Sequence, residues 1–534
     1  MNQVEVKRTQ IQFLSYMIGL INIWIFGKVI GDSGVAYLAA ALEAFVILWT
    51  LTGSKIPDAL GKMLRSRNNK GQYKNADKMR RNIMIQQCVI GLLGTLLFIG
   101  CSGVFAEKIF HVPQSRFLMM LLAPVVFIRA ISNVLLGYFQ GEGSELPTAV
   151  SGVLRQIFLL GLGLLFSNML GKYGEKVSAL LGQEAFTYMY GGLGIVVAIL
   201  LTELLIVLFL VLIYKGSSRT RNKRDTDGMK ATDSFMGHAR GLYRNMGGKI
   251  LLGLLESLPL WMGLIFYQKS VSDVSVAADS YGVYIGKYLV LCGFVVLGIS
   301  MLLISVNAKV ASSVRKDEQR YAKGIFQSGL RIGIIHALFF TVFAAIMANQ
   351  LAGLFGGSGS VELAKMLSFG SVAILCAVLA YYFSRMLMLI SKDHFVYITA
   401  GIGDVAFIIS AVIMLNAGNM GILALVCAGM IGAGVYAVLS GILVCRVLRT
   451  GIDGLRTLAI PAGSACLMGL LCLLLGKAFT PHLGNLVTIL VCLILGCMVY
   501  WALLLLLRCF REQELDNIPG GRIIRMVGQM LRVF

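Results

Sequence analysis

Two things are scarce in this sequence: charge and paired cysteines. Only 14% of the 534 residues are charged, whereas 57% are hydrophobic. The 11 cysteines lie almost wholly within apolar runs, and no CxxC pair occurs among them. We interpret them as small buried hydrophobic residues, so the sequence predicts neither a disulfide framework nor a metal site.

Motifs typical of enzymes are missing as well. The chain has no Walker A sequence, no HExxH and no nucleophile elbow, and its acidic residues are too scattered to form a paired-carboxylate site. We therefore expect a protein that is not an enzyme, is not driven by ATP and needs no cofactor.

Apolar runs, by contrast, recur from one end of the chain to the other. A run of about 20 residues crosses the hydrocarbon core as an α-helix, and these runs are continuous rather than alternating, which excludes barrel strands. The first run has no small-residue cleavage site, so we expect no cleavable signal peptide. The fold class is an all-α polytopic membrane protein with about 14 transmembrane helices, near residues 11–31, 35–53, 83–105, 117–136, 147–167, 191–214, 250–268, 285–307, 326–350, 364–387, 395–415, 420–445, 457–478 and 485–507.

The net charge of +21 is distributed unevenly. Lys and Arg gather in loops 54–82, 215–249 and 314–323 and in the C-terminal tail, whereas loops 269–284 and 351–363 carry few of them. The positive-inside rule then places both termini of a multi-pass membrane protein in the cytoplasm. Contact with anionic membrane lipids accounts for the charge, and no nucleic-acid partner is predicted.

The longest polar interruption, residues 215–249, divides the chain. We expect a six-helix bundle at 1–214, a cytoplasmic linker at 215–249, a second six-helix bundle at 250–445, and an extra helix pair with an amphipathic tail at 446–534. Two related bundles that rock about a central site are a common plan of transporters. The tail 518–534 has apolar residues at helical spacing among arginines, which predicts a helix on the cytoplasmic leaflet.

Four stretches resemble one protein family. They are KVIGDSGVAYL (28–38), IPDALGKML through NNKGQYKNADKMRR (56–81), GYFQGEGSELPTAVSGVLRQ (137–156) and REQELDNIPGG (511–521). In order and spacing they are similar to the multidrug/oligosaccharidyl-lipid/polysaccharide flippase superfamily, in the branch of polysaccharide exporters, stage V sporulation protein B and lipid II flippases. We expect the third stretch to be a cytoplasmic hairpin in which Gly141 and Gly143 allow a tight bend.

The resemblance implies a flippase of a bacterial plasma membrane that moves a lipid-linked oligosaccharide or cell-wall precursor from the cytoplasmic to the outer leaflet by alternating access. Polysaccharide polymerases or glycosyltransferases are the expected partners, and chains of this type are usually monomers. Some positions depart from the family. Tyr16 and Ile23 stand where two arginines of the first helix are common, Leu136 where Arg is frequent, and Arg155 where Glu is frequent.

Charged residues inside the predicted helices are the candidate site. A charge at the centre of a membrane helix costs about 2.5 to 3.5 kcal/mol on insertion scales, so such residues usually face a bundle interior or an aqueous cavity. Arg129 and Arg155 are the predicted phosphate ligands, because a guanidinium binds phosphate oxygens bidentately and stays charged. The alternative is that each Arg pairs with a carboxylate, Glu43 or Glu203, and locks the first bundle. The predicted substrate-binding set is Arg129, Arg155, Lys28 and Glu43.

Two acids of the second half are predicted to couple transport to an ion. Glu256 and Asp404 lie in apolar runs, where a carboxyl group takes up H⁺ or, when ionised, binds Na⁺. The alternative for each is a hydrogen bond that packs two helices. Two other functions stay open: a cation-coupled drug or metabolite exporter of the same superfamily, which would favour an acidic cavity, and a non-transporting scaffold of a polysaccharide assembly complex.

Overall fold

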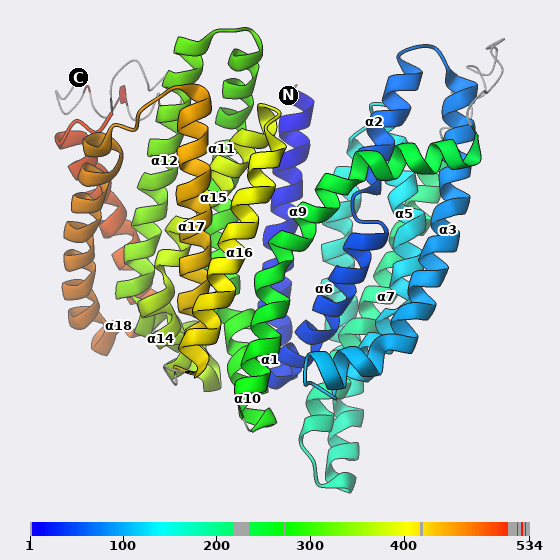
Figure 1. The fold of residues 1–534 in the computed structure, drawn as a ribbon. Helices are drawn as coiled ribbons and strands as arrows, with labels where there is room; N and C mark the ends of the chain where they lie inside the picture. The colour runs from blue at the N-terminus through cyan, green and yellow to red at the C-terminus, as the bar shows by residue number, and fades with distance from the viewer. Residues whose placement is uncertain are drawn as a thin grey trace. The chain divides into compact units, whose positions relative to one another are not determined.

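A computed structural model describes residues 3–216, 234–271, 273–416 and 420–510, together with 521, 525, 526 and 529. These described residues form helices and connecting turns without a strand (Figure 1). Twelve of the helical stretches are long and apolar enough to cross a membrane. The predicted all-α polytopic fold is confirmed, whereas most of the predicted tail helix at 518–534 lies outside the described residues.

Two of the twelve stretches fold back on themselves. In α1 (Gln3–Thr52) the helix is interrupted at Gly31, with φ 72° and ψ 172°. In α18 (Ile460–Leu506) it is interrupted at Gly484, with nearly the same values, φ 73° and ψ 172°. This is a backbone conformation that glycine tolerates and other residues avoid, so one residue suffices to reverse the helix. Each reversal divides one apolar stretch in two, so the twelve stretches found among the described residues hold fourteen helical segments, the number that the sequence predicts.

The chain divides into two compact units. The N-terminal unit is residues 14–282. After α1 from residue 14, it contains α2 (Ile56–Asn68), α3 (Tyr73–Gly103), η1 (Val104–Ile109), α4 (Ser115–Leu122), α5 (Pro124–Gly141), α6 (Leu146–Leu181), α7 (Ala185–Gly216), α9 (Phe235–Ser270) and α10 (Val274–Val283), the last of which ends at the boundary.

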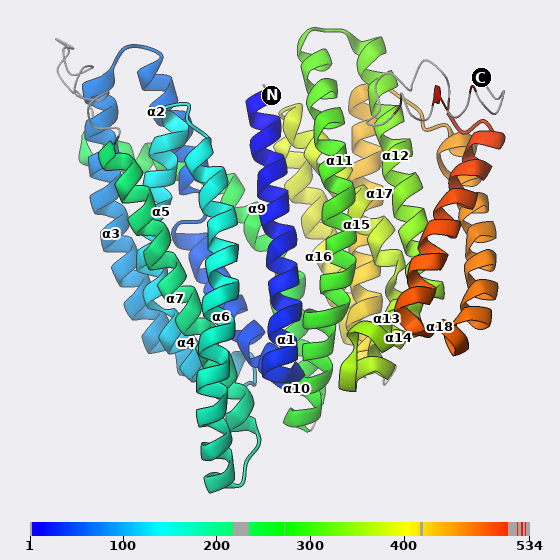
Figure 2. The ribbon, with the colours of Figure 1, turned by 180° about the vertical axis from the view of Figure 1, so that it is seen from behind.

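The C-terminal unit is residues 283–534 with residues 1–13. Its elements are η2 (Tyr284–Tyr288), α11 (Leu289–Arg315), α12 (Gln319–Ile346), α13 (Ala348–Phe355), η3 (Gly357–Gly359), α14 (Ser360–Gly370), α15 (Val372–Leu389), α16 (Asp393–Asn416), α17 (Leu423–Leu448), η4 (Leu455–Ala459) and α18. Figure 2 labels the α-helices of this unit from behind. The predicted division at 215–249 stays a prediction. Of that linker, residues 217–233 lie outside the described residues and residues 235–249 begin α9.

The surface of the N-terminal unit is apolar where a soluble protein is polar. Along α3, Leu92, Leu93, Leu96 and Leu97 are each more than half exposed. Four large leucines on one stretch would be an aggregation hazard in water, but lipid tails solvate them without cost. This outward leucine surface agrees with a helix that lies in a membrane.

The segment 54–82, predicted as a loop, is mostly helical. Apolar residues of α2 are buried at helical spacing, whereas its basic residues are exposed or half-buried. α2 packs on α5 through glycines: an added Cβ at Gly137 would lie 3.0 Å from Leu60 Cβ, and one at Gly141 would lie 2.5 Å from Leu64 Cβ. The two glycines of GYFQG therefore leave room for two leucines of IPDALGKML.

The turn after α5 completes this contact. Arg65 Nη2 donates to the carbonyl of Gln140 at 2.9 Å, and Asn68 Nδ2 donates to Glu142 Oε1 at 3.0 Å. Gly143 adopts φ 81° and provides the predicted bend. The bend does not depend on Gly141, because that residue is the last of α5 and serves close packing instead.

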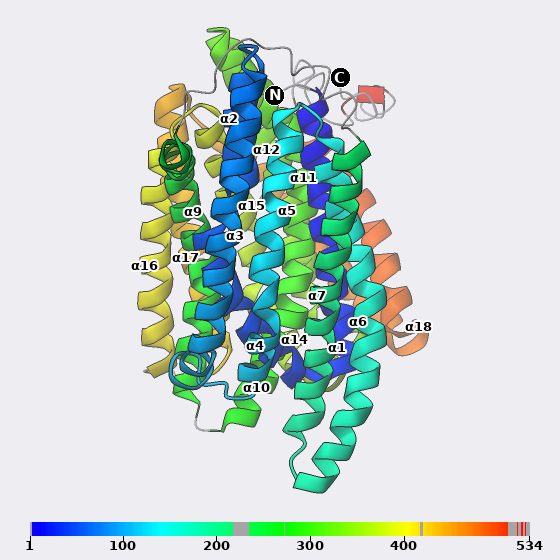
Figure 3. The ribbon, with the colours of Figure 1, turned by 90° about the vertical axis from the view of Figure 1, so that its right-hand side faces the viewer.

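The helices α6 and α7 form a hairpin that extends beyond the other helices of the N-terminal unit. With 36 and 32 residues they are about 54 and 48 Å long at 1.5 Å per residue, against a hydrocarbon core of about 30 Å. Their shared end projects beyond the neighbouring helices of this unit in every view (Figures 1, 2 and 3). Ser178 Oγ contacts Thr187 Oγ1 at 2.8 Å across the hairpin, and Leu180 at its tip is 85% exposed.

Candidate functional site

Three helices of the N-terminal unit bring the site together. Proline occupies the first turn of both α5 and α6, where its missing N–H group costs nothing. α6 and α7 approach so closely that a Cβ at Gly194 would lie 2.4 Å from the carbonyl oxygen of Phe166. This close packing holds Arg129 of α5, Arg155 of α6 and Glu203 of α7 within contact of one another.

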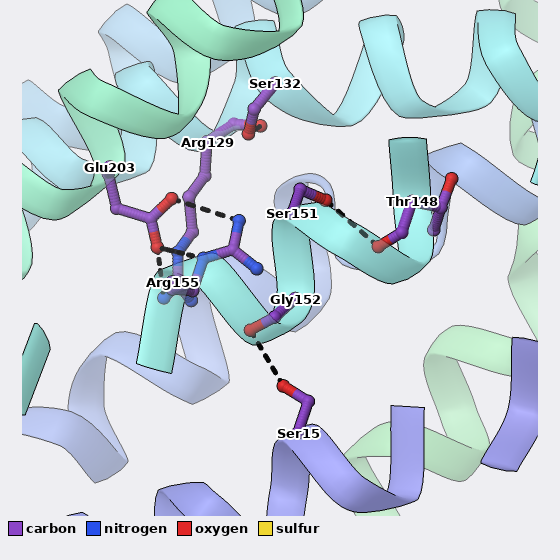
Figure 4. A network of polar contacts seen from close by, with 8 residues as sticks. All are labelled: Ser15, Arg129, Ser132, Thr148, Ser151, Gly152, Arg155 and Glu203. Carbon is purple, nitrogen blue, oxygen red and sulfur yellow. Dashed lines mark hydrogen bonds and ion pairs between the residues drawn. The ribbon is translucent and has the colours of Figure 1, made fainter. Parts of the chain in front are cut away.

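Glu203 accepts hydrogen bonds from both arginines (Figure 4). Its Oε1 lies 2.7 Å from Arg129 Nη2, 2.8 Å from Arg129 Nε and 2.9 Å from Arg155 Nε. Its Oε2 accepts from Arg155 Nη2 at 3.2 Å. The side chain of Glu203 is 1% exposed, that of Arg129 19% and that of Arg155 24%. We refer to Arg129, Arg155 and Glu203 as the Arg–Glu–Arg cluster.

The cluster keeps one positive charge. Two guanidinium groups face one carboxylate, so a single charge of opposite sign would be needed for neutrality. The Nη1 group of each arginine makes no hydrogen bond to any residue that the structure describes. A buried cluster with spare charge and spare N–H donors is suited to bind an anion.

Arg129 is held more firmly than Arg155. Its guanidinium carbon lies 4.7 Å from the ring centre of Trp49 and 5.1 Å from that of Phe45, both on the second half of α1. Cation–π contacts of this kind contribute about 0.5 to 2 kcal/mol each, depending on desolvation. Arg129 is thus fixed on two aromatic rings, whereas Arg155 is fixed by Glu203 alone among the described residues.

The first half of α1 adjoins the cluster through α6. Ser15 Oγ donates to the carbonyl of Gly152 at 2.8 Å (Figure 4), and Asn22 Nδ2 donates to the carbonyl of Gln156 at 2.9 Å. These contacts flank Arg155 on both sides. Tyr16, at one of the positions where the family resemblance would place an arginine, is 58% exposed.

The other predicted substrate ligands do not join the cluster. Lys28 is exposed on α1, with its Nζ 4.0 Å from the ring centre of Trp24. Glu43 is half-buried on α1 and has no hydrogen-bond or ion-pair partner in the described part of the chain. Of the two carboxylates considered as partners of the arginines, the structure therefore selects Glu203.

The two predicted ion-coupling acids lie in different units. Glu256 is an exposed residue of α9 in the N-terminal unit, and Asp404 is a half-buried residue of α16 in the C-terminal unit. Asp404 Oδ2 is buried without a hydrogen-bond partner among the described residues. In the ranges that the structure describes, no three potential ligands among His, Cys, Asp and Glu form a group able to hold a metal.

Sequence reasoning missed three residues of interest. Trp49 and Phe45 could have been found, because they are two aromatic residues one helical turn apart in a chain with only 4 tryptophans. Arg331 of α12 is 1% exposed, the largest fully buried side chain described, and lies inside the predicted run 326–350. Its position as a charged residue within an apolar run could have identified it from the sequence.

Comparison with known proteins agrees with this architecture. The family model for polysaccharide biosynthesis proteins matches residues 8–235, a range that contains the whole Arg–Glu–Arg cluster. Stage V sporulation protein B of Bacillus subtilis (strain 168) is 30% identical over 167 residues, which are 30% of this chain and 32% of that protein. The lipid II flippase MurJ of the same organism is 24% identical over 197 residues, 34% of this chain and 35% of that protein.

The matched stretches thus span about a third of the length of these curated relatives. Over the whole chain the likeness is structural. A solved structure of the lipid II flippase MurJ in an inward closed conformation superimposes with a TM-score of 0.63 at 13% identity, covering 94% of this chain and 99% of that one. At this identity the superposition shows a shared fold.

Proposed function

We propose that this chain, which belongs to the multidrug/oligosaccharidyl-lipid/polysaccharide flippase superfamily, moves a lipid-linked oligosaccharide or cell-wall polysaccharide precursor from the cytoplasmic to the outer leaflet. The family model, the flippase relative and the shared fold support a membrane flippase. The chemistry of the Arg–Glu–Arg cluster supports a substrate with a phosphate or pyrophosphate.

The main observation behind this proposal is the uncompensated positive charge of the cluster. A lipid-linked sugar must take its phosphate across a layer that excludes charge, and an arginine that is already desolvated offsets that charge without losing its own. One negative charge of the substrate neutralises the cluster. The sugar then passes through the protein while the lipid tail stays in the membrane, and alternating access exposes the head group first to one side and then to the other.

The two arginines have different roles in this scheme. Arg129, fixed on two aromatic rings and on Glu203, keeps the carboxylate in place. Arg155, the more exposed of the two, turns its free Nη1 group to the phosphate. Lys28 and Glu43 are proposed to line the path of the head group, at the end of the first half of α1 and in its second half.

Transport without ATP needs another source of free energy. One elementary charge that moves through 100 mV supplies about 2.3 kcal/mol, which biases a two-state transporter severalfold. We propose Glu256 and Asp404 as the groups that couple the cycle to H⁺ or Na⁺. The protein works as a monomer, beside the polymerase or glycosyltransferase that uses or supplies its substrate.

Reconstitution in proteoliposomes tests the function. The wild-type protein should translocate a lipid-linked oligosaccharide, and R155Q should reduce the rate at least tenfold, since a charge-assisted hydrogen bond contributes about 1.5 to 3 kcal/mol. R155Q leaves the Arg129–Glu203 pair neutral, so it should still fold. The matched control is R116Q, which removes one charge from an exposed pair with Glu107. Failure of the wild-type protein to move any lipid-linked sugar, with or without ion gradients, would refute the proposal.

One observation favours a second candidate, a cation-coupled exporter of the same superfamily. Glu43 and Asp404 are half-buried acids without a hydrogen-bond or ion-pair partner in the described residues, which suits a cationic substrate. If E43Q or D404N abolishes export of an organic cation while R155Q leaves it unchanged, the exporter is the better description.

A further inference from the structure

The first part of α9 has an unusual course within the N-terminal unit. α9 has 36 residues, whereas about 20 suffice to cross the hydrocarbon core, and its apolar run begins only at Ile250. Its first part runs across the long helices of this unit in Figure 1 and is seen end-on in Figure 3. We call residues 235–249 the crossing segment.

The crossing segment is fixed to the unit along one face. Leu242 and Met246 are fully buried in the hydrophobic core that α2, α3, α5 and α7 share. Gln86 Nε2 of α3 donates to the carbonyl of Phe235 at 2.8 Å, and Asn82 Nδ2 contacts His238 Nδ1 at 3.0 Å. Apolar burial and polar contacts on the same face hold the segment firmly against α3.

The opposite face is exposed and basic. Met236, Arg240 and Arg244 follow one another at intervals of four residues, which places them on one side of the helix, and all three are exposed. Neither arginine has a hydrogen-bond or ion-pair partner among the described residues. Met236 is 67% exposed and Phe235 44%, so apolar surface lies beside the two charges.

We propose that this face is a binding surface for the anionic phospholipid head groups of the membrane in which the protein lies. A helix that runs across the membrane helices, with apolar residues beside arginines, fits the boundary between acyl chains and head groups. Arginine donors complement phosphodiester oxygens, and the segment belongs to the side that the basic loops assign to the cytoplasm. The surface is independent of the Arg–Glu–Arg cluster and of the proposed transport.

A lipid titration tests this surface. Full-length protein in detergent would be titrated with phosphatidylglycerol or phosphatidylcholine, and bound lipid measured by native mass spectrometry. Each basic residue near an anionic surface accounts for about fivefold in binding, so R240Q/R244Q should bind phosphatidylglycerol about 25-fold more weakly. R240K/R244K keeps both charges and should remain within about threefold of the wild type.

A matched control distinguishes this surface from a general effect of net charge. K172Q/K176Q removes two charges from the exposed end of the α6–α7 hairpin and should bind phosphatidylglycerol like the wild type. Equal affinity of R240Q/R244Q and the wild type for phosphatidylglycerol would overturn the proposal, as would equal binding of phosphatidylcholine and phosphatidylglycerol by the wild type. Displacement of the lipid by millimolar inorganic phosphate would instead assign the arginines to a free anion.

Discussion

Replacing Glu203 by Gln tests the electrostatics of the Arg–Glu–Arg cluster most directly. The substitution keeps the size of the side chain and removes the one negative charge that both guanidinium groups contact, at 2.7 Å and 2.9 Å. Two positive charges then remain beside a buried, uncharged amide. Their mutual repulsion, which the carboxylate offsets in the wild type, would no longer be compensated.

The expected loss of stability is large because the side chain of Glu203 is only 1% exposed. Breaking a buried ion pair by removing one partner typically costs about 3 to 5 kcal/mol. In a domain of this size such a loss lowers the melting temperature by roughly 6 to 20 °C. Arg129 and Arg155 are partly exposed, and water that reaches them screens the repulsion, so we expect the lower half of this range.

Thermal unfolding of the detergent-solubilised protein measures this effect. The informative comparison is a double-mutant cycle of E203Q, R155Q and the combined variant. R155Q alone leaves a neutral pair and should lower the melting temperature less than E203Q does. The combined variant carries one guanidinium beside a neutral amide and should be more stable than E203Q. An E203Q variant as stable as the wild type, or a combined variant no better than E203Q, would show that repulsion between the two arginines does not govern the stability of the cluster.

The glycine contacts lead to two further expectations. Gly194→Ala should destabilise the protein by roughly 3 kcal/mol or more, above the usual 1 to 3 kcal/mol of overpacking, because its Cβ would clash with the backbone of Phe166, which cannot move to another rotamer as a side chain can. Gly161→Ala, whose Cβ would have no atom within 4 Å, is the control and should leave the free energy of unfolding unchanged. Gly141→Ala should cost about 1 to 3 kcal/mol, because the new Cβ would lie 2.5 Å from Leu64 Cβ; Gly161→Ala is the control here too, and equal stability of the two variants would show that Gly141 does not pack on Leu64.

The sequence predicts the crossings well and the contacts poorly, for one physical reason. An apolar run of sufficient length must become a membrane helix, so composition alone places the helices. Which acid meets Arg129 depends on how each helix is rotated, and both Glu43 and Glu203 lie in apolar runs. Rotation is set by close packing, such as that of Gly194 on α6, and hydropathy contains no information about it.

The sequence predicts the charged segments less accurately for a related reason. In α2 the basic residues suggest a loop, although Ile56, Leu60 and Leu64 have the spacing of a helix with one buried face. The packing role of Gly141 can be inferred only once α2 is known to be a helix, because its contact partner belongs to α2. Arg331 is equally hard to place, because an apolar run contains no local signal for the contacts of its one arginine.

The projecting hairpin of α6 and α7 is a suitable place for a tag that reports membrane topology. Gly182 lies between the helices with φ 69°, and its neighbours Leu181 and Gln183 are exposed, so an epitope inserted there would disturb no buried contact. The hairpin is closed below this point by Ser178 and Thr187, which would keep an insertion from spreading into the bundle. Antibody access to such a tag in intact cells, compared with permeabilised ones, would orient the whole chain with a single label.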